Sequence, residues 1–182
     1  MNPNSVITKA MNFAAQKHAD QRRKGAKQEP YINHVTEVAW LLAEHTGGED
    51  AELIAAGLLH DTIEDTKTTH AELVREFGQN IADIVMEVSD DKSLPKAERK
   101  RLQIEHAPHA SEKSRLLKIA DKAANLRAIL ESPPEGWSQK RKAEYFNWAK
   151  AVVDGCRGLN KGLEENFDAI YKRGIKSFKL KP

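Results

Sequence analysis

His60-Asp61-Thr62-Ile63-Glu64-Asp65 follows without a break an apolar run formed by residues 53–59. Such a run predicts a buried helix, and this helix would end in a histidine and an aspartate, with two more carboxylates one turn further on. A carboxylate that is partly desolvated and unpaired costs about 2–5 kcal/mol unless a cation or hydrogen bonds satisfy it. The simplest interpretation is a bound divalent metal, around which the rest of the chain forms the scaffold and the substrate clamp.

Apolar residues recur at helical spacing on both sides of this stretch, and no segment alternates with the period of two that is typical of strands. Residues that start or stop helices divide the chain into further segments. The expected starts are Asn4 or Ser5, Pro30, Asp50, Thr69, Pro95, Ser111 and Ser138, and the expected ends include Gly47-Gly48 and Phe77-Gly78. The pattern predicts an all-α fold, a single compact orthogonal bundle over residues 1–182 with a loose basic tail from about residue 174.

Overall charge and composition point away from nucleic-acid and membrane partners. The 182 residues carry a formal net charge of only +2, so no global field favours a polyanion or a lipid surface. No run approaches the length of a membrane span, and the N-terminus lacks the charged and apolar parts of a signal peptide. The single cysteine, Cys156, can form no disulfide within the chain, which fits a reducing compartment. We therefore expect a cytoplasmic protein, and the choice between a monomer and a homodimer stays open.

Two histidines and two aspartates are the candidate metal ligands: His34, His60, Asp61 and Asp121. They come from distant places in the sequence, on or near helical segments, as a site assembled between packed helices requires. Two imidazoles with two carboxylates suit a six-coordinate Mn²⁺ or Fe²⁺, although the residue types leave zinc and magnesium open. Each has an ordinary structural explanation by itself; Asp121, for example, could pair with Lys118 or Lys122. Taken together, they predict one divalent ion per chain.

Several further segments extend this set. They are Arg22-Arg23-Lys24, Tyr31-Ile32-Asn33-His34, Leu58-Leu59-His60-Asp61-Thr62-Ile63-Glu64-Asp65-Thr66, Asp90-Asp91-Lys92, Leu94-Pro95-Lys96, Lys118-Ile119-Ala120-Asp121-Lys122, Asn125-Leu126-Arg127 and Pro134-Glu135-Gly136-Trp137. The spaced His…His-Asp…Asp set resembles that of the HD-domain metal-dependent phosphohydrolases. The flanking segments resemble the hydrolase domain of the RelA/SpoT alarmone enzymes, and most of all its short, hydrolase-only members of the metazoan SpoT-homologue type. The resemblance covers about residues 5–165.

This resemblance implies an HD-domain fold and a Mn²⁺-dependent enzyme of the stringent response. Its reaction would be hydrolysis of the 3′-diphosphate of guanosine 3′,5′-bis(diphosphate), ppGpp, or of the pentaphosphate, to GDP or GTP and pyrophosphate, which lowers alarmone levels. The positions that match the metal ligands are His34, His60, Asp61 and Asp121. Those that match the pair handling the attacking water are Glu64 and Asp65. Those that match positions near the nucleotide and its phosphates are Arg23, Lys24, Lys96, Asn125 and Tyr145.

The residue types support this chemistry independently. Glu64 and Asp65 follow Asp61 by three and four positions, so both reach the metal face if the turn stays helical. Either carboxylate could then take the proton from water that attacks the phosphorus bonded to O3′. The basic segments 22–24 and 92–101 supply positive charge for a polyanionic ligand, although a solvated face is an alternative explanation for Arg99-Lys100-Arg101.

Two other functions stay open. Ala123-Ala124 replaces the bulkier pair that is usual in the enzymes it resembles. A pocket widened by these alanines would admit another nucleotide that carries a ribose phosphate. The second alternative is a metal protein that binds the alarmone without cleaving it. The Glu64-Asp65 pair argues against this, since a pure binder gains little from two more carboxylates beside an anionic ligand.

Overall fold

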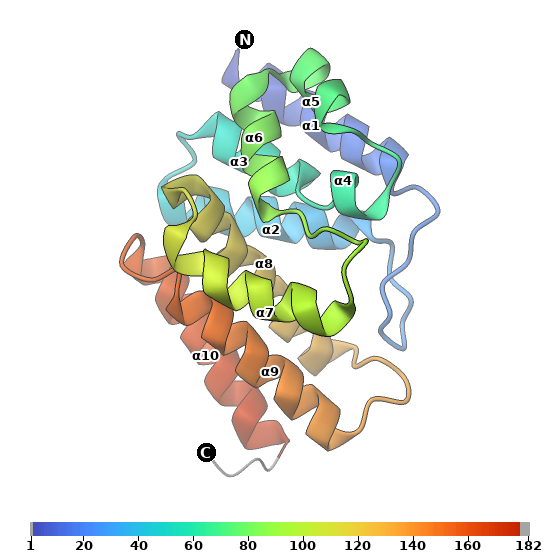
Figure 1. Ribbon diagram of the computed structural model, residues 1–182, viewed down its shortest axis with the longest axis vertical. Helices are drawn as coiled ribbons and strands as arrows, with labels where there is room; N and C mark the ends of the chain where they lie inside the picture. The colour runs from blue at the N-terminus through green and yellow to red at the C-terminus, as the bar shows by residue number, and fades with distance from the viewer. Residues whose placement is uncertain (1, 179–182) are drawn as a thin grey trace.

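The computed structural model describes residues 2–178, and in that range the extended elements are helices, with only isolated β-bridges besides. The all-α prediction is confirmed. The elements are α1 (Pro3–Lys17), α2 (Ile32–Thr46), α3 (Ala51–Leu59), α4 (Thr62–Asp65), α5 (His70–Phe77), α6 (Gln79–Val88), α7 (Lys96–His106), the short 3-10 helix η1 (Ala107–His109), α8 (Glu112–Glu131), α9 (Gln139–Asp154) and α10 (Lys161–Ser177) (Figure 1). None of these helices combines the length and the apolar character needed to cross a membrane.

Four helices start where the sequence predicts a cap. The side chains of Asp50, Thr69, Ser111 and Ser138 each accept a hydrogen bond from the backbone N–H three residues further on. At the other end of α2, Gly47 adopts the left-handed conformation, with φ at 77°. Such residues satisfy or redirect the backbone groups that helix ends leave unpaired, which is why the local sequence is sufficient to place these boundaries.

The first helix starts earlier than expected. α1 is capped by Asn2, whose side chain accepts a hydrogen bond from the Asn4 N–H at 2.9 Å. Pro3 occupies the first helical turn, where its missing N–H costs nothing and its fixed φ favours the helix. The expected cap at Asn4 or Ser5 is therefore wrong.

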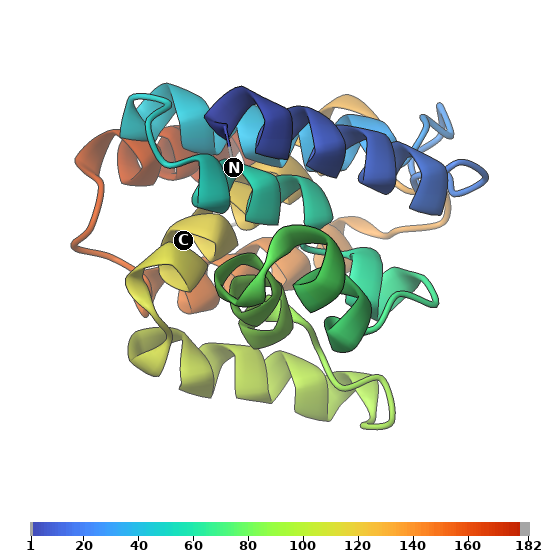
Figure 2. The ribbon, with the colours of Figure 1, turned by 90° about the horizontal axis from the view of Figure 1, so that it is seen from above.

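α3 is the central helix of the N-terminal half. All of residues 53–59 are buried, and α1, α2, α6 and α8 pack around this helix (Figure 2). Gly57 permits the close approach of α2, since a Cβ atom there would lie 2.8 Å from Leu42 Cδ1. This packing brings His60, which follows α3 directly, to the part of α2 that carries His34.

α8 connects the two halves of the molecule. It packs against α2, α3 and α6 on one side and against α9 and α10 on the other (Figure 1). Its buried residues are distributed around the helix and include two lysines, Lys118 and Lys122, with exposed fractions of 7% and 6%. Because the helix is covered on so many sides, these two lysines line a cavity between the helices rather than extending into solvent.

α10 extends beyond the expected start of the basic tail. Gly174 is a buried residue of this helix, which continues to Ser177. Residues 179–182, which belong to the predicted tail, lie outside the described residues.

Gly174→Ala should destabilise the protein although alanine is the better helix former. A Cβ atom at this position would lie 2.0 Å from Cε1 of the buried Phe146 ring. Helix propensity favours alanine by about 1 kcal/mol, whereas overpacking a core costs about 1–3 kcal/mol or more, so the clash should win. Thermal unfolding should show a fall in Tm of about 2–8 °C; an unchanged or higher Tm would contradict the packing of α10 on α9.

Candidate active site

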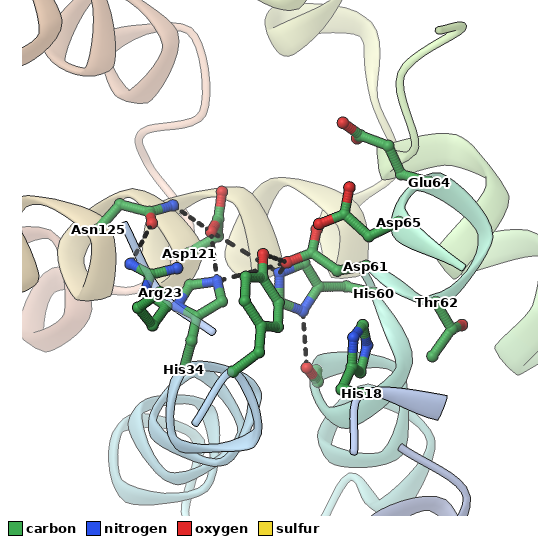
Figure 3. A network of polar contacts seen from close by, with 12 residues as sticks. His18, Arg23, His34, His60, Asp61, Thr62, Glu64, Asp65, Asp121 and Asn125 are labelled. Atoms are coloured by element: carbon green, nitrogen blue, oxygen red, sulfur yellow. Dashed lines mark hydrogen bonds and ion pairs between the residues drawn. The ribbon is translucent and has the colours of Figure 1, made fainter. Parts of the chain in front are cut away.

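Three side chains from separate helices meet at one point. His34 lies near the start of α2, His60 directly follows α3, and Asp121 lies midway along α8. Their candidate ligand atoms lie within 4.8 Å of one another. Asp121 Oδ1 is 3.2 Å from His34 Nε2 and 3.7 Å from His60 Nε2, and Figure 3 shows the three groups pointing toward a common centre. Three of the four residues predicted as metal ligands are thus brought together.

Asp61, the fourth predicted ligand, lies in the same cluster. Its Oδ2 atom is 3.1 Å from His60 Nε2 and 3.5 Å from His34 Nε2. The Tyr31 hydroxyl donates a hydrogen bond of 2.6 Å to this oxygen. Burial, together with the charge of Asp61, raises the pKa of Tyr31. Tyr31 therefore stays a neutral donor that holds Asp61 toward the imidazoles.

The orientation of His60 fits metal binding. Its Nδ1 atom lies 2.8 Å from the Gly57 carbonyl oxygen, which can only accept, so Nδ1 carries a hydrogen and Nε2 is the nitrogen left for a metal. That Nε2 atom is buried and has no hydrogen-bond partner in the described part of the chain. A ring nitrogen buried against two carboxylates calls for a proton or a metal ion between them, and a backbone carbonyl on the remote nitrogen is the usual support of a metal-bound histidine. The two nitrogen and two oxygen donors fit a divalent transition metal.

The carboxylates of the cluster are held in the ionised form. Burial raises the pKa of Asp61, but the neighbouring His60 and His34 outweigh it and hold this pKa well below its usual range. Burial also raises the pKa of Asp121, and there Lys122, whose Nζ lies 2.8 Å from Oδ2, lowers it strongly together with the imidazoles. Two anionic carboxylates are therefore available to a cation at neutral pH.

Asp65 is fixed at both of its oxygens. The Lys92 ammonium lies 2.5 Å from Oδ1, and the Gln21 side chain donates a hydrogen bond of 3.0 Å to Oδ2. Gln21 is held in turn by the buried His18, whose Nδ1 lies 2.6 Å from the Gln21 amide oxygen. The sequence alone left His18 without a role. The structure places it in a chain of polar contacts, from His18 through Gln21 to Asp65, that sets the position of Asp65.

Glu64 lies in a different electrostatic environment. Its carboxylate accepts a hydrogen bond of 3.2 Å from the Asp90 N–H, and the Arg99 guanidinium lies 3.6 Å away. Burial, with the charges of Asp61 and Asp90, raises the pKa of Glu64 to about 7. A carboxyl group with this pKa exchanges its proton near neutral pH, as a general base must.

Two adjoining cavities open at the cluster. The larger, of about 410 Å³, is lined by His60, Asp61 and Asp121 and by many cationic side chains. The smaller, of about 230 Å³, is lined by Trp137 and Pro134 among others. The residues that line both are Lys24, Tyr31, Asp65, Asn125 and Tyr145. The larger cavity suits phosphate groups, and the smaller suits a nucleobase.

All five residues predicted to lie near the nucleotide line these cavities: Lys96 the larger, Arg23 the smaller, and Lys24, Asn125 and Tyr145 both. Arg23 donates a hydrogen bond of 2.9 Å to Asn125 Oδ1, and Asn125 Nδ2 donates one of 2.6 Å to Asp121 Oδ1. The predicted nucleotide contacts are thus linked directly to the metal cluster.

Sequence reasoning missed some of the cavity lining and misplaced one pair. Lys118 and Lys122 line the larger cavity, yet they entered the sequence argument only as partners for Asp121. Their spacing, three residues before Asp121 and one after it on an apolar helix, was the available signal. Ala123 and Ala124 are fully buried in the core and line neither cavity. The alternative of a pocket widened by these alanines therefore has no support in the residues that line the cavities.

Comparison with known proteins agrees with this geometry. The model of the HD domain matches residues 10–147. The chain belongs to the HD-domain family. Within the family, it is 53% identical over 167 residues to the Xenopus tropicalis protein named guanosine-3′,5′-bis(diphosphate) 3′-pyrophosphohydrolase MESH1, covering 92% of this chain and 93% of that relative. The Homo sapiens protein of the same name is 49% identical over 170 residues, covering 93% and 95% of the two chains.

A solved HD-domain structure shares the fold. It is described as a metazoan orthologue of SpoT that hydrolyses ppGpp and plays a role in starvation responses, and it matches with a TM-score of 0.90 at 43% identity, over 95% of this chain and 97% of the other. The resemblance to short, hydrolase-only HD-domain proteins is therefore confirmed.

Proposed function

We propose that this chain hydrolyses the 3′-diphosphate of ppGpp, and of the corresponding pentaphosphate, to GDP or GTP and pyrophosphate. The observation that carries the proposal is the convergence of His34, His60, Asp61 and Asp121 where a cationic cavity meets a smaller one lined by Trp137. The near full-length likeness to proteins named for this reaction supports it.

The four cluster residues would hold the metal, for which we propose Mn²⁺, one ion per chain. A divalent ion supplies Lewis-acid chemistry, lowering the pKa of water and offsetting phosphate charge. Glu64, with its pKa of about 7, takes the proton from the water that attacks the phosphorus bonded to O3′. Asp65, fixed by Lys92 and Gln21, orients that water.

The remaining predicted residues bind the nucleotide. Lys24 and Lys96 are unpaired cations at the larger cavity, within the described part of the chain, and offset phosphate charge. Arg23 and Tyr145 lie where the smaller cavity adjoins the cluster. Asn125 connects the two regions through its hydrogen bonds to Arg23 and Asp121. The substrate is thereby placed with its 3′ side toward the metal cluster.

Product analysis tests this function directly. The protein should be incubated with ppGpp and Mn²⁺, and the products separated by ion exchange. We expect GDP and pyrophosphate in equal amounts. Release of inorganic phosphate, with a guanosine 3′-monophosphate derivative as the other product, would show that the terminal phosphate bond is cut instead.

The pH dependence of kcat/KM should show a base that ionises near neutrality. Because Glu64 acts as the carboxylate and its pKa is raised to about 7, activity should fall about tenfold per pH unit below the pKa. A bound cation moves the midpoint downward without changing the sign of the slope. Asp90→Asn removes one of the charges that raise this pKa, while it keeps the backbone N–H that Glu64 accepts from, so its acid limb should move to lower pH. An acid limb that stays in place in the Asp90 variant would contradict the assignment of Glu64.

A further inference from the structure

Lys118 is a buried lysine without a partner. It lies on α8 one turn before Asp121, has an exposed fraction of 7%, and lines the larger cavity. Within residues 2–178 its ammonium group makes neither a hydrogen bond nor an ion pair, in contrast to Lys122, which pairs with Asp121. Burial, with the nearby charge of Lys122, lowers the pKa of Lys118. An unpaired ammonium group in such a place is unfavourable until an anion joins it.

Two further lysines line the same cavity. The ammonium groups of Lys100 and Lys122 lie 4.5 Å and 4.9 Å from the centroid of the Trp148 ring. The indole N–H donates a hydrogen bond of 3.1 Å to the Lys100 carbonyl oxygen, which ties α7 to α9. We call Lys100, Lys118 and Lys122 the lysine lobe. Its three positive charges are gathered by the packing of three helices, α7, α8 and α9.

The other carboxylates of the cavity are engaged elsewhere. Asp65 pairs with Lys92 at 2.5 Å. Glu64 and Asp90 each lie 3.6 Å from the Arg99 guanidinium. Lys100 and Lys118 are left without a carboxylate partner in the described part of the chain, so the counter-charge for these two members of the lysine lobe must come from a ligand.

The order of residues along α8 indicates which part of the ligand the lysine lobe contacts. Asn125 lines both cavities, Asp121 belongs to the metal cluster one turn earlier, and Lys118 lies almost one turn earlier again, lining the larger cavity alone. Asp121 and Lys118 are separated by about 4.5 Å along the helix axis, a distance on the scale of one phosphate unit. A nucleoside 3′-diphosphate laid along α8 would have its ribose at Asn125, its attacked phosphorus at Asp121 and its terminal phosphate at Lys118.

We propose, on the basis of the proposed function, that the lysine lobe binds the terminal phosphate of the 3′-diphosphate and so grips the pyrophosphate that leaves. Water adds to the phosphorus bonded to O3′, the O3′–P bond breaks, and O3′ keeps the electron pair and receives a proton. Both phosphates stay joined in the pyrophosphate product. Lys118 neutralises the terminal phosphate throughout and makes the site selective for a 3′-diphosphate over a 3′-monophosphate.

Lys118→Met tests the proposal, since methionine keeps the length and apolar stem of the side chain and removes the charge. With Mn²⁺-loaded protein, the inhibition constant of inorganic pyrophosphate should rise about 10- to 100-fold, the range for a lost charge-assisted contact. The inhibition constant of GDP should not change. The kcat/KM for ppGpp should fall while that for guanosine 5′-diphosphate 3′-monophosphate is retained. Equal weakening of GDP and pyrophosphate, or of neither, would overturn the proposal.

Two controls separate binding from structure. Lys140→Met removes one positive charge from an 86%-exposed side chain on α9, and it should leave every one of these constants unchanged. The Tm of the Lys118→Met protein should equal or exceed that of the wild type, because an unpaired buried charge is lost. A lower Tm together with losses on both substrates would instead show that Lys118 is a structural residue.

The outcome for the lysine lobe is distinguishable from the outcome for the proposed function. If the wild-type protein does not hydrolyse ppGpp, the proposed function fails. Calorimetric titration of pyrophosphate into the Mn²⁺-loaded wild type and Lys118→Met proteins then tests, independently of the reaction, whether the lysine lobe binds pyrophosphate. Tight binding by the wild type with weak binding by the variant supports it, and equal affinities overturn it.

Discussion

Asp121→Asn should lower the turnover of ppGpp by more than about 10³-fold, because the loss of metal chemistry removes several kcal/mol of transition-state stabilisation. Asp121 Oδ1 lies close to both imidazoles of the cluster, 3.2 Å from His34 Nε2 and 3.7 Å from His60 Nε2. An asparagine of the same shape keeps a carbonyl oxygen for Lys122 but removes one of two negative charges. Bound Mn²⁺ should fall from one ion per chain to a small fraction of that, as measured by elemental analysis after gel filtration.

Thermal unfolding gives an independent measurement of the same change. A metal that binds the folded chain raises its Tm by mass action, so adding Mn²⁺ should stabilise the wild-type protein and leave Asp121→Asn almost unaffected. Asp83→Asn is the matched control, since Asp83 is an exposed carboxylate that also pairs with a histidine, His70, at 2.7 Å. Full metal content and turnover in Asp121→Asn would remove Asp121 from the ligand set.

The sequence was sufficient for features that depend on neighbours along the chain. Asp50 and Ser138 cap helices because each needs only a backbone N–H three residues away. His60 and Asp61 are adjacent in the sequence, so the end of one buried helix places both of them in the cluster. The wrong cap predicted for α1 is also a local matter. Asn2, Asn4 and Ser5 are all residue types that can cap a helix, and Asn2 is the cap because Pro3 suits the first helical turn.

The sequence was insufficient where the environment of a helix comes from distant elements. α8 has apolar residues around most of its surface, so its periodicity defines no solvent-facing side for Lys118. Only the packing of α7 and α9 shows that this lysine points into a cavity. Ala123 and Ala124 are misjudged for the same reason, since they face the core, where α8 packs against α2 and α10. The meeting of His34 with Asp121 is likewise a product of packing; residue types suggested the pair as ligands of one metal, and the family resemblance supported it, but neither supplied the distance between them.

Glu64→Gln should reduce kcat by about 10²–10⁴-fold, the usual contribution of a general base, with bound Mn²⁺ unchanged. Glutamine keeps an oxygen for the hydrogen bond from the Asp90 N–H but cannot accept a proton. The residual activity should also lose the acid limb that Glu64 causes. Asp65→Asn is the informative comparison, because both of its oxygens already contact Lys92 and Gln21. If the Asp65 variant lost the acid limb and the Glu64 variant kept it, the roles of the two carboxylates would be reversed.

Glu64→Gln, which lowers kcat, should raise the stability of the metal-free protein at alkaline pH. The folded-state pKa of Glu64, about 7, lies above the ordinary glutamate value of 4.5, so the folded chain holds this proton more tightly than the unfolded chain does. Its contribution to stability is present in full below the unfolded pKa and is lost as the pH rises through 7. Above that pH the metal-free wild type therefore carries a buried charge at a cost that Glu64→Gln does not have. The variant should unfold a few degrees higher at alkaline pH, since about 1 kcal/mol moves Tm by about 2–4 °C in a chain of this size. A carboxylate kept at the expense of stability and needed for turnover is expected of a catalytic base, whereas a structural carboxylate would lower Tm when removed.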